Sequence, residues 1–487
     1  MSAPSPITQY KDQDYNALKA QCLESGKLFE DPTFPANDSS LYYDKRESHG
    51  IVWLRPKEIT DDPKLYVDGG DRLDMRQGRL GDCWFVASLS SLATEKNLLY
   101  RVIPNDQTFD KDYAGILHVR FWRMGQWADI VIDDRLPCFE KSKRPCYVHP
   151  SDKHEFWGCF IEKAYAKVNN SYEALVGGVN WEALETFTGG IHEDYHMPSM
   201  PADGFQRIFN ALARHSLLGC FGVHHEKGVK GHVLPNGLVW GHAYSVDKAA
   251  KVKIEGNDEE VPLVRIRNPW GCGEWKGAWS DGSAEWDTVS EETKKAIGMA
   301  VANNGEFWMS YEDFISNYVT LEICMLKPDI EYKDGNKMKW NFVEVAGEWK
   351  KGVNAGGCWN FRKTYHTNPQ IRFEIPEDDT PEGTSIFIAL MQMFTRPFAG
   401  EHKKTQSICF TIYRVEGDQV GKRLDENYLL HHRFNARCKA FGRSAEISNR
   451  FTFKKGHYVV IPVTYKPDEE TKFCLRIFTE KPINVTK

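Results

Sequence analysis

A cysteine at the start of a predicted helix is the first feature of this chain that could support chemistry. Residues 77–84 read Gln-Gly-Arg-Leu-Gly-Asp-Cys-Trp, and an apolar run follows through Leu92. A cysteine in the first turn of a helix lies beside unpaired amide N–H groups and the positive end of the helix dipole, which stabilise a thiolate. Cys83 is therefore predicted to be a nucleophile. Gln77 on the same loop could donate its side-chain N–H groups to the oxyanion of a tetrahedral intermediate.

The alternative for Cys83 is a buried cysteine without reactivity, which is the usual state of this residue type. The chain has 12 cysteines, so most of them are expected to be inert. Cys83 differs because Gly78, Gly81 and Asp82 precede it and indicate a sharp polar turn, which an ordinary core cysteine does not require.

A thiolate nucleophile needs a base that is distant in sequence and is oriented by a third polar group. His242 lies in the apolar, strand-like segment 238–246, and Asn268 ends an alternating strand-like segment just before Pro269. Asn268 is predicted to fix the tautomer of the His242 ring, and Trp270 to screen that hydrogen bond from water. An isolated strand histidine is usually a satisfied core residue. The order Cys, His, Asn over three segments instead favours a papain-like triad.

A zinc site is the other chemistry that cysteine and histidine side chains support. The sequence contains no C-x-x-C pair and no H-E-x-x-H motif, so the spacing does not favour zinc.

Composition places the chain among globular proteins. Its 487 residues predict roughly two to four domains, and 41% hydrophobic residues can build sizeable cores. A net charge of −6 with interspersed signs gives no indication of nucleic-acid binding. Neither a signal peptide nor an apolar run of about 20 residues is visible, so the chain is expected in the cytoplasm with its cysteines reduced.

Periodicity divides the chain into four predicted segments. They are an N-terminal lead-in at 1–45 with a helix around 15–23, a Cys-bearing lobe at 46–190, a His- and Asn-bearing lobe at 191–330, and a strand-rich domain at 331–487. The expected elements are helices at 84–92, 156–168 and 205–213, strands at 116–123 and 126–132, and C-terminal strands at 370–375, 385–391, 407–415, 458–463 and 473–478. Short, regularly spaced strands are typical of a β-sandwich.

Three motifs together resemble the calpain family of cysteine proteases: residues 77–84, Gly-His-Ala-Tyr-Ser at 241–245, and Arg-Asn-Pro-Trp-Gly at 267–271. The resemblance covers nearly the whole chain. It implies an α+β fold with a two-lobed papain-like protease core followed by an antiparallel β-sandwich. It implies a calcium-dependent intracellular cysteine endopeptidase that performs limited proteolysis of protein substrates. It also assigns the roles derived above: catalysis to Cys83, His242 and Asn268, the oxyanion hole to Gln77, and shielding to Trp270.

The resemblance further implies one Ca²⁺ in each lobe, held by carboxylates and backbone carbonyls, which are the oxygen ligands that calcium prefers. The matching positions are Gly69, Gly70, Asp74 and Glu155 in the first lobe, and Glu274, Asp281 and Glu306 in the second. Asn304 stands where relatives have an aspartate, so the second site is expected to bind calcium more weakly or to be lost. Arg72 matches a family arginine that couples the lobes by reaching Glu306.

The last domain and the end of the sequence determine which partners are expected. Acidic residues at 374–382 could bind calcium or phospholipid weakly, or form only a soluble turn. No EF-hand loop occurs before Lys487, so the resemblance implies a member without the penta-EF-hand domain and without the EF-hand small subunit. A monomer is expected.

Two other functions remain open. A non-proteolytic calpain-like scaffold or regulatory protein would keep the fold without cleaving substrates, although the triad residues are present. Transglutaminase-like acyl transfer also uses a cysteine followed by tryptophan and a distant histidine. The asparagine at position 268, where that chemistry uses an aspartate, argues against it.

Overall fold

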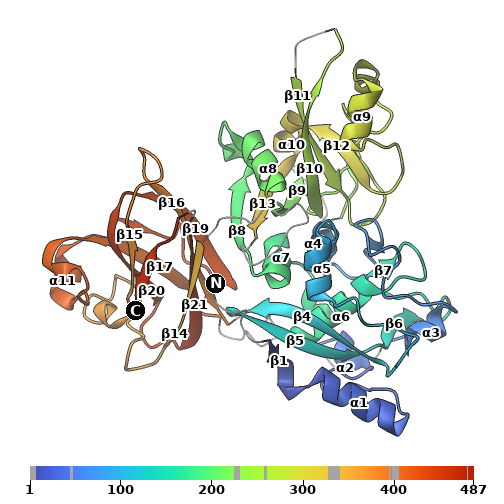
Figure 1. Ribbon diagram of the computed structural model, residues 1–487, viewed down its shortest axis with the longest axis horizontal. Coiled ribbons are helices and arrows are strands. Elements are labelled where there is room, and N and C mark those ends of the chain that lie inside the picture. The colour runs from blue at the N-terminus through green and yellow to red at the C-terminus, as the bar shows by residue number, and fades with distance from the viewer. Residues whose placement is uncertain are drawn as a thin grey trace. The chain divides into compact units, whose positions relative to one another are not determined.

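The chain folds into two compact units (Figure 1). The computed structural model describes residues 7–43, 48–223, 231–256, 260–326, 341–393, 396, 405–479 and 481–486. The first unit comprises residues 1–122 and 127–326, and the second comprises 123–126 and 327–487. Both segments predicted as protease lobes therefore lie in the first unit.

The first unit begins with short elements around a buried helix. They are β1 (Thr8–Gln9), α1 (Tyr15–Ser25), α2 (Asp38–Leu41), β2 (Ile51–Leu54), α3 (Pro56–Ile59), β3 (Met75–Arg76), α4 (Cys83–Ala93), α5 (Lys96–Val102), β4 (Ile116–Arg123), β5 (Gln126–Asp133), β6 (Leu136–Phe139), β7 (His149–Pro150), α6 (Trp157–Val168) and α7 (Asn180–Thr188). Every residue of α4 is buried, because its serines and alanines allow close packing on all sides.

A six-stranded sheet forms the rest of the first unit, in the order β12-β11-β10-β9-β13-β8, with antiparallel neighbours. Its strands are β8 (Ile191–His196), β9 (Leu217–Val223), β10 (Ala243–Lys253), β11 (Glu260–Arg267), β12 (Glu306–Ser310) and β13 (Tyr318–Met325), and its helices are α8 (Gly204–Ala213), α9 (Glu291–Ile297) and α10 (Tyr311–Asn317). Helix α4 packs against β9 and β10, which fixes the position of the Cys-bearing helix on this sheet.

The second unit is built from two antiparallel sheets that share one hydrophobic core. One sheet has the order β14-β21-β16-β19 and the other β18-β17-β20-β15-β22. The elements are β14 (Asn341–Trp349), β15 (Ile371–Ile375), β16 (Thr384–Gln392), β17 (Ile408–Val415), α11 (Glu426–His431), β18 (Ala436–Arg437), β19 (Glu446–Phe453), β20 (Gly456–Thr464), β21 (Thr471–Thr479) and β22 (Asn484–Thr486). Alternating burial along β15 follows the period-two pattern of its sequence.

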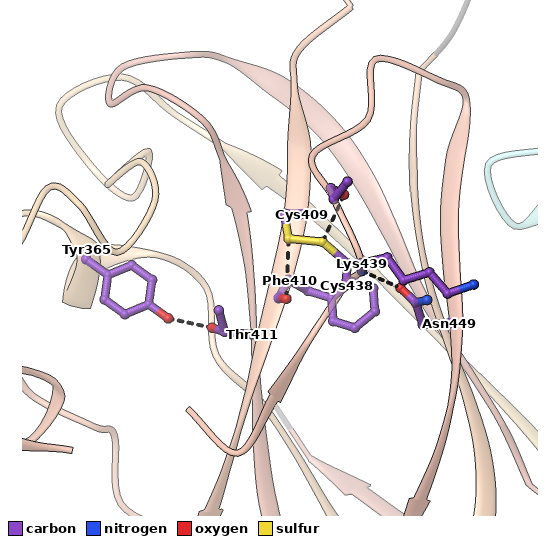
Figure 2. Close-up of a disulfide and its surroundings, with 8 residues drawn as sticks. Tyr365, Cys409, Phe410, Thr411, Cys438, Lys439 and Asn449 are labelled. Atoms are coloured by element: carbon purple, nitrogen blue, oxygen red, sulfur yellow. Dashed lines mark hydrogen bonds between the residues drawn. A yellow bond between two sulfur atoms is a disulfide. The ribbon is translucent and has the colours of Figure 1, made fainter. Parts of the chain in front are cut away.

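A disulfide between Cys409 and Cys438 corrects the expectation that all cysteines are reduced (Figure 2). Cys438 directly follows the short edge strand β18, and its N–H donates to the Phe410 carbonyl on β17 at 3.1 Å. This pairing of the two strands places the sulfur atoms beside each other, which sequence spacing alone did not indicate. The other ten cysteines form no disulfide.

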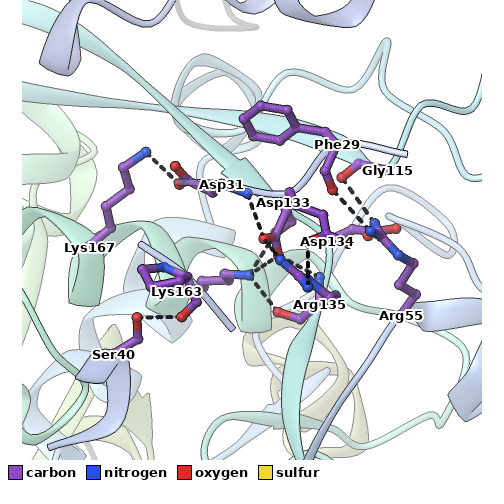
Figure 3. Close-up of polar contacts among 12 residues, drawn as sticks. Phe29, Asp31, Ser40, Arg55, Gly115, Asp133, Asp134, Arg135, Lys163 and Lys167 are labelled. Atoms are coloured by element: carbon purple, nitrogen blue, oxygen red, sulfur yellow. Dashed lines mark hydrogen bonds and ion pairs between the residues drawn. The ribbon is translucent and has the colours of Figure 1, made fainter. Parts of the chain in front are cut away.

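Buried ion pairs fasten the N-terminal segment to the first unit (Figure 3). Lys167 Nζ lies 2.6 Å from Asp31 Oδ2, and Lys163 Nζ lies 2.6 Å from Asp133 Oδ1. Asp133 Oδ2 also accepts a hydrogen bond from the Asp31 N–H at 3.0 Å. Residues 7–43, predicted as a lead-in with one helix, are therefore an integral part of this unit.

Most predicted elements agree with the structure, with shifts of one to three residues at their ends. The main difference is His242, which lies just before β10 instead of inside a strand. Among the described residues, no helix is both long enough and apolar enough to cross a bilayer.

Candidate active site

Cys83 is the first residue of helix α4, as the sequence predicted. Its side chain is nearly buried, with 8% of the residue exposed. The helix begins here because Asp82, at its N-cap, has non-helical backbone angles, while its carbonyl accepts the first helical hydrogen bonds from Phe85 and Val86. The thiol therefore lies at the positive end of an eleven-residue helix, where a thiolate is stabilised.

His242 and Asn268 are joined by a hydrogen bond between Nε2 and Oδ1 of 2.9 Å. Asn268 is fully buried, and its Nδ2 donates to the Gly273 carbonyl at 3.0 Å, so Oδ1 must be the acceptor facing the ring. His242 Nε2 is therefore the donor, and Nδ1 is the basic nitrogen of the neutral ring. The Trp270 ring lies 4.8 Å from the His242 ring, in a position to shield this bond.

Helix α4 packs on β10, so the elements next to Cys83 and His242 are in contact. Cys83 begins α4, and His242 directly precedes β10. Asn180 at the start of α7 supports this junction, because its Nδ2 donates to the Tyr244 carbonyl at 3.1 Å. A side chain at Gly219 on β9 would collide with Asn180, since a Cβ there would lie 1.8 Å from Nδ2.

Gln77 uses its side-chain N–H groups within its own loop. Nε2 donates to the Leu80 carbonyl at 2.8 Å and makes a long contact of 3.4 Å with Asp82 Oδ1. Its backbone N–H donates to the Pro269 carbonyl at 3.0 Å, which places Gln77 beside the Asn268 segment. The weak contact to Asp82 is the one that could be exchanged for an oxyanion.

In the segment predicted as the first lobe, the half-buried Asp74 and the buried Glu155 form a carboxyl pair. Their side chains hydrogen-bond each other, and burial together with the Asp74 charge raises the pKa of Glu155 to about 8. Glu155 Oε1 accepts from the Val67 N–H at 2.7 Å. Two carboxyl groups in contact hold a proton that a cation can replace, so this pair fits a calcium site.

The two glycines predicted beside this pair fit a calcium site only in part. Gly69 and Gly70 both have positive φ values, which fits a tight loop. The Gly69 carbonyl already accepts hydrogen bonds from Lys96 Nζ at 3.1 Å and from the Tyr100 hydroxyl at 3.0 Å. A cation could bind this carbonyl only if the Lys96 ammonium moved away.

In the second lobe, Glu274 and Asp281 hold the loop that precedes β12. Glu274 Oε1 accepts from the N–H groups of Asn304 and Gly305 at 2.9 and 2.8 Å, and Asp281 Oδ2 accepts from Ala302 N–H at 3.0 Å. Burial raises the pKa of both carboxyl groups, and the Glu306 charge adds to each shift. The donor set is chemically suited to calcium.

Arg72 contacts Glu306 as the resemblance suggested, within a larger charge network. Arg72 Nε lies 2.8 Å from Glu306 Oε2 and 3.1 Å from Asp247 Oδ2. Arg265 bonds the same two acids, with Nη1 3.0 Å from Glu306 Oε1 and Nε 3.0 Å from Asp247 Oδ1. Both Glu306 oxygens are thus occupied by arginines that a calcium ion would have to displace or share.

Sequence reasoning missed several polar residues around the site. Asp247 and Arg265 belong to no motif that the sequence analysis used. The period-two alternation along β11 does place the side chains of Arg265 and Arg267 on one face of the strand. Glu162 hydrogen-bonds Asp82 directly before Cys83, and burial followed by the Asp82 charge raises the pKa of Glu162 strongly. The sequence signal was the presence of three charged residues, Glu162, Lys163 and Lys167, within helix α6, whose other residues are mostly apolar.

Comparisons with known proteins match most of both units. A family model for "Calpain family cysteine protease" matches residues 29–325, and one for "Calpain large subunit, domain III" matches residues 345–478.

Among curated proteins, the chain is 41% identical to Calpain-A of Drosophila melanogaster over 483 residues, covering 97% of this chain and 58% of that protein. It is 42% identical to human Calpain-9 over 476 residues, covering 98% of this chain and 68% of that protein. It is 41% identical to the human Calpain-1 catalytic subunit over 489 residues, covering 97% and 68%. The chain thus spans 58 to 68% of the length of these relatives. Motifs, fold and comparisons agree, and the chain belongs to the calpain family of cysteine proteases.

Proposed function

We propose that this chain is a calcium-dependent cysteine endopeptidase that performs limited proteolysis of protein substrates. The observation that carries the proposal is the 2.9 Å hydrogen bond between His242 Nε2 and Asn268 Oδ1, next to a helix that begins with Cys83. A scaffold without activity would not need this bond, or a cysteine at a helix N-terminus. We interpret the two segments of the first unit as papain-like lobes and the two sheets of the second unit as the β-sandwich of the family.

The proposed reaction is acyl transfer through a thioester. The Cys83 thiol gives its proton to His242 Nδ1, and the thiolate attacks the scissile carbonyl carbon. When the tetrahedral intermediate collapses, His242 returns this proton to the leaving amine, and the acyl group stays on the sulfur. Water then attacks the thioester with His242 as base, which releases the acid product and restores the thiol. Asn268 keeps Nδ1 as the basic nitrogen throughout.

The oxyanion is proposed to bind the Cys83 amide and the Gln77 side chain. Gln77 would exchange its 3.4 Å contact with Asp82 for the substrate oxygen while keeping its 2.8 Å bond to Leu80. One such donor contributes about 10²- to 10³-fold to kcat in comparable sites. Loss of the Gln77 amide should therefore lower kcat more than it changes KM.

Calcium is proposed to bind Asp74 and Glu155 in the first lobe, and Glu274 and Asp281 in the second. The positive charge of a bound cation would displace the proton shared by Asp74 and Glu155, so that both carboxyl groups are ionised. It would also draw the carboxylates of each loop together. Glu306 belongs to the second set by resemblance, and its two arginine partners together with Asn304 support a weaker second site. Gly69 and Gly70 remain candidates for the carbonyl ligands of the first.

Protein substrates are the proposed partners, and the chain is proposed to act in the cytoplasm as a monomer. Weak phospholipid contact through residues 374–382 has less support. Asp379 lies 3.3 Å from Lys481, and Asp378 accepts a hydrogen bond from the Lys455 N–H at 2.5 Å. These contacts fit a structural turn.

The test is cleavage of an unstructured protein by wild type and by Cys83→Ala over a calcium titration, with a chelator as control. Cleavage that requires both calcium and Cys83 is expected. Cleavage that persists in chelator would remove calcium from the proposal while keeping the nucleophile. An absence of cleavage at every calcium concentration would favour the scaffold function.

A further inference from the structure

Arg267 is a buried arginine that directly precedes Asn268 at the end of β11. Only 1% of the residue is exposed. Its Nη1 donates to Ser90 Oγ on α4 at 2.7 Å, and its Nη2 donates to the Met75 carbonyl on β3 at 3.1 Å. One guanidinium therefore bridges the strand of Asn268 and two elements of the Cys-bearing segment.

The contacts of Arg267 are unusual for a buried arginine because both acceptors are neutral. Among the described residues it makes no ion pair, and its Nε has no hydrogen-bond partner. Burial lowers the pKa of Arg267 to about 10. The negative charges of Glu306 and Asp247 offset part of this effect without forming an ion pair with Arg267. A buried charge without a directly paired carboxylate still costs stability that an apolar side chain of similar size would avoid. Stabilising the fold is therefore a poor explanation for an arginine at this position.

The elements that Arg267 joins are the ones that carry the catalytic groups. Ser90 lies seven residues, or two helical turns, after Cys83 and on the same face of α4. Met75 lies two residues before Gln77, whose N–H donates to the Pro269 carbonyl at 3.0 Å. The peptide segment 267–269 is thus fixed to both the nucleophile helix and the oxyanion loop, and Asn268 between these anchors holds His242.

We propose that Arg267 is a positioning residue that sets the distance and orientation between Cys83 and the His242–Asn268 pair. The guanidinium fork suits this role because its donors have a fixed geometry and reach two acceptors at once, whereas a lysine ammonium cannot span both. The proposal rests on the proposed protease function. A displacement of reacting groups by about 1 Å can lower the rate by about 10²-fold. A small shift of segment 267–269 after loss of the Arg267 contacts would therefore be enough to lower kcat.

The test compares Arg267→Met, Arg267→Lys and Ser90→Ala with wild type. We expect Arg267→Met to lower kcat by about 10²-fold with KM changed less than about threefold, because substrate contacts remain. Thermal stability should be kept or increased, since a buried unpaired charge is removed. Arg267→Lys should recover part of kcat, and Ser90→Ala should lose less than Arg267→Met because the Met75 contact stays.

A second readout does not depend on proteolysis. In wild type, alkylation of Cys83 by iodoacetamide, followed by mass spectrometry of its peptide, should persist at acidic pH, as a thiolate paired with an imidazolium requires. In Arg267→Met this acidic reactivity should fall toward that of an ordinary thiol. The matched control is Arg476→Met, which removes a fully buried arginine paired with Glu446 in the second unit. It should lower stability and leave the Cys83 profile unchanged.

The outcomes separate the two proposals. A folded Arg267→Met with the kcat and Cys83 profile of wild type would overturn the positioning role. A wild type that reacts at acidic pH in an Arg267-dependent way but cleaves no protein would contradict only the protease function. A wild-type Cys83 without acidic reactivity would contradict both.

Discussion

At the residue scale, Asn268 is the side chain whose contacts most constrain the candidate chemistry. Its Oδ1 accepts hydrogen bonds from His242 Nε2 and from the Trp270 N–H at 3.0 Å, and its Nδ2 donates to Gly273. Because Oδ1 accepts two of these bonds and Nδ2 donates the third, the amide cannot turn over without leaving buried groups unpaired. The orientation of the His242 ring therefore follows from the local backbone around Asn268, independently of substrate.

We predict that Asn268→Ala lowers kcat by about 10- to 100-fold, with KM within about twofold, because the ring loses the acceptor that fixes its tautomer. The measurement is steady-state kinetics on a peptide substrate. Asn368→Ala is the control, since Asn368 is an equally buried asparagine with three hydrogen bonds in the second unit. It should reduce stability and spare kcat, and a similar loss of kcat in both variants would show that the effect of Asn268 is structural.

At the element scale, the candidate site is assembled by contacts between segments that are distant in sequence. Helix α4 begins at the nucleophile, and strands β10 to β12 carry the groups that orient the base. The loop holding Arg72 meets Asp247 on β10 and Glu306 on β12. The Arg72 side chain is only 23% exposed and lies within a four-charge network, so its contribution exceeds that of an isolated surface pair.

We predict that Arg72→Gln lowers the Hill coefficient of calcium activation toward 1, because the network is the contact between the two proposed calcium loops. A calcium titration of cleavage rate, with wild type alongside, measures this change. Arg207→Gln serves as control, since Arg207 pairs with Asp203 on the surface of α8. Equal Hill coefficients for Arg72→Gln and wild type would remove the coupling role.

The Cys409–Cys438 disulfide gives a separate prediction for the second unit. It closes a chain segment with a sequence separation of 29 residues, and a loop of that length contributes about 3–4 kcal/mol to stability in the chain-entropy account. We expect a double variant, Cys409→Ala with Cys438→Ala, to unfold at lower denaturant concentration. Alkylation of the unfolded wild type should label ten cysteines before reduction and all 12 after it. Twelve labelled cysteines before reduction would contradict the pairing.

At the scale of the whole molecule, each unit carries its own core and its own electrostatic constraints. In the first unit, buried charges tie the N-terminal segment to α6 (Figure 3), and burial lowers the pKa of Lys167 to about 8. Glu322 on β13 is a further buried acid, which accepts a hydrogen bond from the Trp181 N–H at 3.0 Å. Such groups make the stability of the first unit depend on pH.

We predict a pH-dependent stability from Glu322. Burial raises its pKa to about 7, whereas a glutamate in an unfolded chain titrates near the ordinary value of about 4.3. Between these two pH values the folded chain holds a proton that the unfolded chain releases. The unfolding free energy therefore falls as pH rises across this window, by about 3 kcal/mol in total, and is steady above it.

Glu322→Gln keeps an acceptor for Trp181 and cannot ionise, so it should remove this slope and raise the melting temperature at pH 8 more than at pH 4. Thermal unfolding between pH 4 and 8 measures the difference, with Glu312→Gln on the surface of α10 as the control. The same slope in both glutamine variants would exclude Glu322 as its source.

The sequence alone was sufficient to predict the candidate catalytic residues and most of the elements that carry them. Cys83 could be placed at a helix start because a polar turn and an apolar run are local patterns, and helix α4 begins there. Strand β15 follows in the same way from alternation over a few residues, and strands β16 and β17 follow from short, nearly continuous apolar runs. Local patterns indicate which face of an element is buried. They therefore predict the type of element and the position of a candidate reactive residue within it.

Apart from the bond between His242 and Asn268 and the contact of Arg72 with Glu306, only the tertiary structure identified the partners of buried polar groups. It paired Cys409 with Cys438, occupied the Gly69 carbonyl with Lys96, and joined Arg267 to Ser90 across 177 residues of sequence. Periodicity indicates that a side chain is buried, but it does not specify which group forms a hydrogen bond or ion pair with that side chain. That group is decided by how sheets and helices pack, which depends on the whole chain at once.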